Sequence, residues 1–129
     1  GYTNLALVLH RDNHLHGQPF NFGPPAQQDQ SVGELVSAMS NYWSQVRWTD
    51  VSTKDGGPYE SGLLKLNCDK ALYHLKWRAI WGFDETVRET ALWYSNYYLK
   101  SGQKVAEFSL NQINHYMDTA KKKGLLWSK

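Results

Sequence analysis

Residues Pro58–Trp77 read PYESGLLKLNCDKALYHLKW and place a turn, an apolar segment and a helix start one after another. Gly56–Pro58 predict the turn, because Gly adopts backbone angles closed to other residues and Pro fixes its own φ. Tyr59 and Glu60 follow at the exit of this loop, where ligand-binding side chains are often found. Leu63–Leu66 then predict a short, mostly buried strand.

A helix is expected directly after that strand. Asn67 suits the N-cap position, because its side-chain oxygen can accept a hydrogen bond from a free backbone N–H of the first turn. Asp69 falls in the first turn, near the positive end of the helix dipole. Ala71, Leu72 and Leu75 recur at helical spacing and predict the buried stripe.

Apolar residues at helical spacing predict further helices on both sides of this stretch. The first carries its apolar residues over Tyr2–Leu9 and is expected to end near Asp12–Asn13, and the capping box Ser31–Glu34 opens the second. The buried stripe expected of the second helix is Val32, Leu35, Val36, Met39 and Tyr42 or Trp43.

Two more helices are predicted in the C-terminal half. One is capped by Asp84 and carries Phe83, Val87, Ala91, Tyr94 and Tyr98 on one face. The other opens at a second capping box, Ser109–Gln112, and ends in the lysines 121–123, which favour the negative end of the dipole, followed by Gly124 as the cap.

Two segments alternate apolar and polar residues as short strands do, Phe20–Phe22 and Val46–Thr49. Together with Leu63–Leu66 they predict an α/β fold of helices with a few short strands. No repeat and no linker interrupts the chain, so residues 1–129 are expected to form a single domain.

The composition bounds the class of protein. With 41% hydrophobic and 20% charged residues the 129-residue chain is globular, and a net charge of +2 is too small to indicate nucleic acid or an anionic membrane surface. Cys68 is alone, which excludes an internal disulfide and fits a reducing compartment, the cytoplasm. No apolar run approaches a membrane span. The start at Gly1, without Met, predicts a fragment.

The sequence lacks the patterns of several catalytic chemistries. His10 and His14 are four apart, but Arg11 stands where a zincin has Glu, so no metal site is predicted. Cys68 is expected to be a small buried hydrophobe. No glycine run suits a dinucleotide, and no Tyr has Lys four residues on. We therefore predict no catalytic, cofactor-binding or metal-binding residue in this chain.

Glu60 is the one residue that the pattern singles out for a ligand. A carboxylate at the exit of a Gly-rich loop can accept hydrogen bonds from hydroxyl groups, although an exposed loop carboxylate is more often merely solvated. The residues alone leave these two readings open.

The chain resembles the C-terminal part of extended short-chain dehydrogenases that act on nucleotide-activated sugars. In that family an acidic residue after a Pro precedes an apolar strand, a polar-x-x-Lys-Ala helix start and a Trp, as Pro58, Glu60, Lys70–Ala71 and Trp77 do here. The fuller pattern most resembles the CDP-glucose 4,6-dehydratases. The matching pieces are Phe20–Pro24, Tyr59–Cys68, Thr90–Tyr94 and Ser109–Ile113, spread over nearly all the chain.

The resemblance implies a substrate-binding portion whose Rossmann part is absent. The complete enzyme would use NAD, bound by the missing N-terminal part, to convert CDP-glucose to CDP-4-keto-6-deoxyglucose for deoxysugars of surface polysaccharides. It implies a homo-oligomer in the cytoplasm, with no nucleic-acid or membrane partner. Within this chain it implies that Glu60 accepts hydrogen bonds from the ribose hydroxyls, with Tyr59 and Asn21 as further substrate contacts.

One departure from the family concerns the diphosphate. Several relatives place an Arg just before the Pro of the motif, where this chain has Gly57. Lys54, Arg47 or residues upstream of Gly1 would then have to bind the phosphates. Two alternatives stay open: another nucleotide-sugar dehydratase or epimerase, and a non-catalytic protein–protein interaction module whose interface would use the six Trp and eight Tyr.

Overall fold

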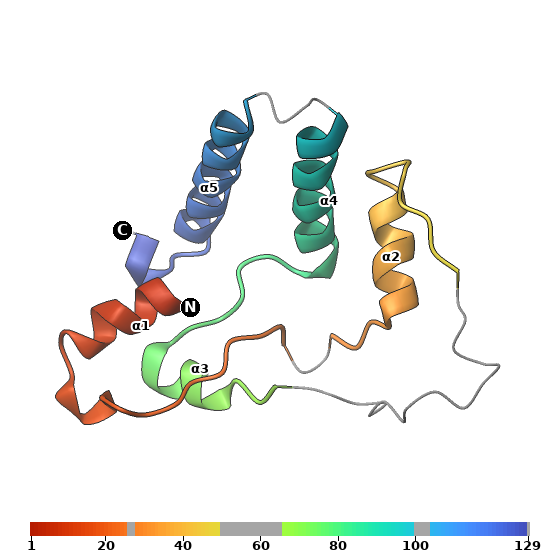
Figure 1. The fold of residues 1–129 in the computed structure, drawn as a ribbon. Coiled ribbons are helices and arrows are strands. Elements are labelled where there is room, and N and C mark those ends of the chain that lie inside the picture. Colours follow the sequence, from red (N-terminus) through yellow and green to blue (C-terminus); the bar gives the residue numbers. More distant parts are fainter. Residues whose placement is uncertain (26–27, 50–65, 100–103, 129) are drawn as a thin grey trace, which may run out of the picture.

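The computed structural model describes residues 1–25, 28–49, 66–99 and 104–128. This part of the chain is helical and holds no strand (Figure 1). The helices are α1 (Tyr2–Leu9), α2 (Val32–Ser40), α3 (Asp69–Leu75), α4 (Phe83–Leu99) and α5 (Val105–Lys122), with the 3-10 turns η1 (Asn13–Leu15) and η2 (Leu126–Ser128).

The helices form two groups. α4 lies between α2 and α5 and contacts both, while α1 packs against α3 and η2 against α5 (Figure 1). None of the described helices is both long enough and apolar enough to cross a membrane.

The core around α3 joins segments far apart in the sequence. Leu15 of η1 is buried with Ala71 and Leu75, the two stripe positions of α3 that the sequence predicts correctly. Leu72, the third stripe position, is 36% exposed. Partly buried side chains of α1, of the segment between η1 and α2, and of the residue that follows the cap of α3 complete the cluster: Leu5, Val8, Leu9, Phe20, Phe22 and Trp77. Burial of these apolar groups holds α1 against α3.

Two helix ends match the prediction in detail. At the start of α2, the Glu34 N–H donates to Ser31 Oγ at 3.2 Å and the Ser31 N–H donates to Glu34 Oε2 at 2.6 Å, which is a complete capping box. At the end of α5, Gly124 has φ 71°, and the Leu125 N–H donates to the Ala120 carbonyl at 3.1 Å. This is a Schellman cap, whose left-handed position favours glycine.

The start of α3 is displaced by one residue from the prediction. The N-cap position belongs to Cys68, but Asn67 Oδ1 still accepts a hydrogen bond from the Asp69 N–H at 2.9 Å. At the other end Lys76 adopts the left-handed region with φ 51°, and the Trp77 N–H reaches back to the Ala71 carbonyl. A lysine thus occupies a position that favours glycine.

The two predicted strands in the described residues are wrong. Phe20–Phe22 keeps its alternation, with both rings half-buried and Asn21 exposed, but it has no regular secondary structure and packs on the core around α3. Val46–Thr49 turns back along α2, where a Cβ on Gly33 would come within 3.1 Å of Trp48 Cη2. A strand needs a paired neighbour for its backbone groups, and the described chain supplies none. Most of Leu63–Leu66 lies outside the described residues.

The second predicted capping box is also wrong. α5 begins at Val105, so Ser109 and Gln112 lie inside the helix. Their side chains bind α4 instead: Trp93 Nε1 donates to Ser109 Oγ at 2.9 Å, and Gln112 Nε2 donates to the Glu89 carbonyl at 2.7 Å. Ser and Gln can either cap a helix start or bond to a neighbouring helix. Because α5 starts at Val105, four residues before Ser109, the second role is the one observed.

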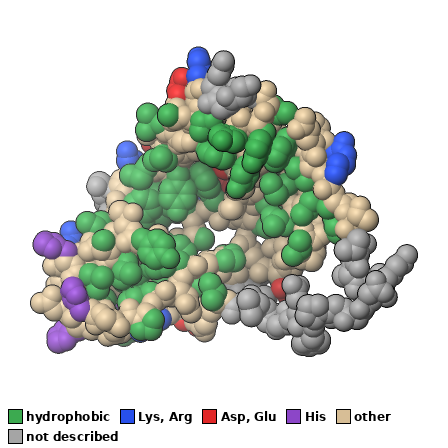
Figure 2. Space-filling view, viewed as in Figure 1, with side chains coloured by type: hydrophobic (Ala, Val, Ile, Leu, Met, Phe, Trp, Pro, Cys, Tyr) green, Lys and Arg blue, Asp and Glu red, His purple; other side chains and the backbone are tan. Residues whose placement is uncertain are grey.

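Some predicted buried faces are open to solvent. On α2, Val36 and Met39 are half-buried as expected, whereas Val32 is 75% exposed because α2 lies at the end of the row of helices (Figure 1). On α4, Val87 and Ala91 are buried but Tyr98 is 61% exposed. Hydrophobic side chains accordingly spread over much of the face drawn in Figure 2.

Candidate functional site

A pocket of about 440 Å³ lies beside the start of α3. Its walls come from the loop after Phe22, the entry into α3 and the segment that leaves α3. The lining residues are Gly23, Pro24, Pro25, Leu66, Asn67, Cys68, Asp69, Leu72, Trp77, Arg78 and Ala79. Its volume is in the range of pockets that bind small molecules.

Hydrogen bonds and ring contacts hold these walls together. Asn21 Nδ2 donates to the Asn67 carbonyl at 3.2 Å and so ties the loop to the entry of α3. The Asn67 side chain in turn donates to Asp69 Oδ2 at 3.2 Å. Trp77, which lines the pocket, packs edge to face on the Phe22 ring, with 5.0 Å between ring centroids. The pocket therefore rests on the same core that joins α1 to α3.

Of the site residues that the sequence predicts, only Asn21 lies in the described part of the chain. Asn21 is exposed and does not line it, but its amide joins two of the walls. Tyr59 and Glu60 lie outside the described residues, and so do Lys54 and Gly57. Leu66, the first described residue after them, lines the pocket.

Sequence reasoning missed the charged residues of the pocket. Arg78 and Asp69 both line it, so it carries one group of each charge. A signal for Arg78 was present, since it directly follows Trp77, the last residue of the family-like stretch. Arg47, which the sequence offered for the phosphates, does not line this pocket, and its guanidinium donates to the carbonyls of Ser44 and Val46.

A second pocket, of about 430 Å³, lies between the start of α1 and α5. Its aromatic walls include Trp81, Tyr116 and Trp127, and the Trp81 and Tyr116 rings meet edge to face at 4.8 Å. Burial raises the pKa of the Tyr116 hydroxyl. No charged side chain lines this pocket.

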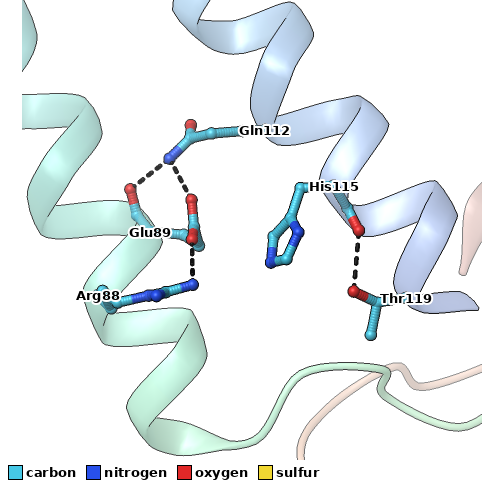
Figure 3. A network of polar contacts seen from close by, with 5 residues as sticks. All are labelled: Arg88, Glu89, Gln112, His115 and Thr119. Carbon is cyan, nitrogen blue, oxygen red and sulfur yellow. Dashed lines mark hydrogen bonds and ion pairs between the residues drawn. The ribbon is translucent and has the colours of Figure 1, made fainter.

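A polar network joins α4 to α5 (Figure 3). Arg88 donates to Glu89 Oε1 at 2.8 Å and Gln112 Nε2 donates to Glu89 Oε2 at 2.8 Å, so both oxygens of this mostly buried carboxylate are engaged. The His115 carbonyl accepts from the Thr119 hydroxyl. The network satisfies a buried charge between helices, which is a structural role.

The described residues hold no group of three or more His, Cys, Asp or Glu side chains that could bind a metal ion. His10 and His14 are exposed, and the His16 ring lies at hydrogen-bond distance from the Leu9 carbonyl. Cys68 is half-buried rather than buried, and its thiol donates to the Leu66 carbonyl at 3.7 Å.

The chain is 28% identical over 118 residues to a CDP-glucose 4,6-dehydratase of Salmonella typhimurium. This similarity is distant and partial. The aligned region is 91% of this chain and 32% of that protein, so the chain spans about a third of the length of the curated relative it matches. No protein-family model and no solved structure matches the chain.

Proposed function

We propose that this chain is the substrate-binding portion of an NAD-dependent CDP-glucose 4,6-dehydratase. The observation that carries the proposal is the similarity to such a dehydratase, which extends over 91% of the chain. The pocket beside α3 supports it, because it lies where the family-like stretch enters its helix and has the size of a small-molecule site. The substrate of the whole protein would be CDP-glucose and its product CDP-4-keto-6-deoxyglucose.

Within this chain we assign the nucleotide to the surroundings of that pocket. Glu60 would accept hydrogen bonds from the ribose hydroxyls, since an ionised carboxylate offers two acceptor oxygens. Tyr59 would be a neighbouring contact. Asn21 would act by holding the loop against Asn67, the contact that its amide makes.

The residues of this chain do not suit NAD. The sequence contains no glycine run that would let a pyrophosphate approach a helix start, and no Tyr with Lys four residues on. The cofactor and the proton-transferring groups would belong to another part of the protein. The part played by this chain is therefore to bind and orient the sugar nucleotide.

Binding measurements on Glu60 test the proposal. Glu60→Ala should weaken CDP binding about ten- to a hundred-fold, because a hydrogen bond to a charged group contributes roughly 1.5–3 kcal/mol. Binding of 2′,3′-dideoxy-CDP, measured by calorimetry, should already be weak and should change little on mutation. Glu107→Ala is the matched control, since it removes an exposed carboxylate of α5 that does not line the pocket. Equal losses for the two nucleotides would mean that Glu60 does not contact the ribose.

Calorimetry with other nucleotides distinguishes a CDP-glucose dehydratase from the other nucleotide-sugar enzymes. A preference for UDP, GDP or dTDP over CDP would favour a different dehydratase or an epimerase. Ribose is common to the ribonucleotides, so the Glu60 result and the base preference are independent.

A protein–protein interaction module is favoured by one feature, the exposed aromatic side chains of α4. Tyr94, Tyr97 and Tyr98 are 41%, 45% and 61% exposed, and Trp43 stacks on Tyr98 with 5.8 Å between ring centroids. Large exposed apolar patches often mark interfaces. A chain that binds no nucleotide but self-associates at micromolar concentration, in ultracentrifugation, would favour this function over the dehydratase.

A further inference from the structure

Arg78 is the cation of the pocket beside α3. Its side chain is exposed and lines the pocket, and no other Lys or Arg is among the lining residues. Within the described part of the chain, its guanidinium makes no hydrogen bond or ion pair. An arginine that is free of protein partners retains all of its N–H donors for a ligand.

The backbone that carries Arg78 is anchored on both sides. Before it, Trp77 is half-buried against Phe22 and donates its N–H to the Ala71 carbonyl at 3.3 Å. After it, Ile80 is only 2% exposed, and its carbonyl accepts a hydrogen bond from Lys123. Only the side chain of Arg78 then has to be ordered when a ligand binds, which lowers the entropic cost of binding.

Four other cations of the described residues are engaged elsewhere. Lys70 lies over the Phe20 ring at 5.0 Å and Lys76 over the Tyr73 ring at 5.2 Å. Arg47 donates to backbone carbonyls, and Arg88 pairs with Glu89. Arg78 is thus the cation best placed to meet an anion in this pocket.

We propose that Arg78 binds the diphosphate of the nucleotide sugar, in place of the arginine that several relatives carry at the position of Gly57. This inference rests on the proposed function for the identity of the ligand, but the anion site itself does not. A guanidinium matches two phosphate oxygens with two parallel hydrogen bonds. Asp69, the opposite charge of the pocket, repels a phosphate and so directs it toward Arg78.

Calorimetry of the full chain with CDP, cytidine and inorganic pyrophosphate tests this inference. Arg78→Ala should weaken CDP and pyrophosphate about ten-fold and leave cytidine unchanged, because only the first two carry the diphosphate. Arg78→Lys should restore part of the loss, since it keeps the charge but not the paired donors. Arg47→Ala, which removes a cation outside the pocket, should change CDP binding by less than about two-fold.

Each outcome separates this inference from the proposed function. Equal CDP affinity with and without the Arg78 guanidinium would overturn the role of Arg78 and leave the CDP-binding function standing. Pyrophosphate binding that depends on Arg78, without any CDP binding, would support the anion site and overturn the nucleotide assignment. An equal loss of CDP affinity in Arg78→Ala and Arg47→Ala would mean that only the net charge matters, and would overturn the anion site. If the chain binds neither CDP nor pyrophosphate, both proposals are overturned.

Discussion

Asn4 of α1 donates a hydrogen bond of 2.9 Å from its side-chain amide to the backbone carbonyl of Leu75, the last residue of α3. The last carbonyls of a helix have no partner within the helix, so this bond satisfies one that is partly buried. It also fixes α1 across the helix that borders the candidate pocket. The two residues are 71 positions apart in the sequence.

Asn4→Ala should lower the free energy of unfolding by about 1 kcal/mol, because the Leu75 carbonyl loses its partner. Ala is the better helix former by about 0.5 kcal/mol, which offsets part of the loss. Urea unfolding measures the change. Thr3→Ala, one position earlier on α1 and exposed, supplies the control and should be neutral or slightly stabilising. A similar gain in stability from both substitutions would show that the Asn4 bond contributes nothing.

Lys76→Gly should raise the free energy of unfolding by roughly 0.5–1 kcal/mol. Lys76 has φ 51°, and in this region a side chain costs energy that glycine avoids. Lys76→Ala keeps the Cβ and also loses the contact with the Tyr73 ring, so it should not stabilise the protein. The same urea titrations compare the two variants. If alanine stabilises as much as glycine, removal of the lysine charge rather than backbone strain explains the gain.

The capping box of α2 should give stability a dependence on pH. The pKa of Glu34 lies below its usual value of 4.5, mainly because the Ser31 backbone N–H donates to the carboxylate and also because the Ser31 hydroxyl does. A lowered folded-state pKa means that the ionised group stabilises the native protein. The stabilisation is complete above the unfolded-state pKa and is lost as the pH falls through the folded one.

Glu34→Gln should therefore be less stable than the original chain near neutral pH, and the difference should shrink as the pH falls below 4.5. Unfolding curves across this range measure it. Glu107→Gln, an exposed change in the first turn of α5, is the control, because the N-cap residue of that helix, Lys104, makes no capping hydrogen bond with its side chain. A difference that grows toward acid pH would contradict the sign expected from the lowered pKa.

Ser109→Ala should lower the free energy of unfolding by about 1 kcal/mol, since it leaves the Trp93 indole N–H without its partner between α4 and α5. Ser109→Thr keeps a hydroxyl and should retain much of the stability. Asn111→Ala, an exposed position of the same helix, measures the gain in helix propensity alone. If Ser109→Ala gains as much as Asn111→Ala, the bond does not contribute to stability.

The sequence predicted much of the helical framework but little of the candidate site. α1 begins where the sequence predicts but ends at Leu9, before the expected end near Asp12–Asn13, and α3 begins within one residue of the expected cap. The pocket walls join Gly23, Asn67 and Arg78, which no local pattern relates. Asn21 was predicted as a substrate contact from the family resemblance, and its hydrogen bond to Asn67 became visible only in the folded chain. Tyr59 and Glu60 remain predictions.

Local chemistry determined the features that depend on a few neighbouring residues. Ser31 with Glu34, and Gly124 after the lysines of α5, act within one helical turn, so the sequence alone indicates them. Tertiary structure decided whether Ser109 caps a helix or binds Trp93, and whether Phe20–Phe22 pairs as a strand or packs on α3. The same side chains satisfy either arrangement locally. Which arrangement forms depends on the partner that lies within reach in the folded chain, and sequence spacing does not specify that partner.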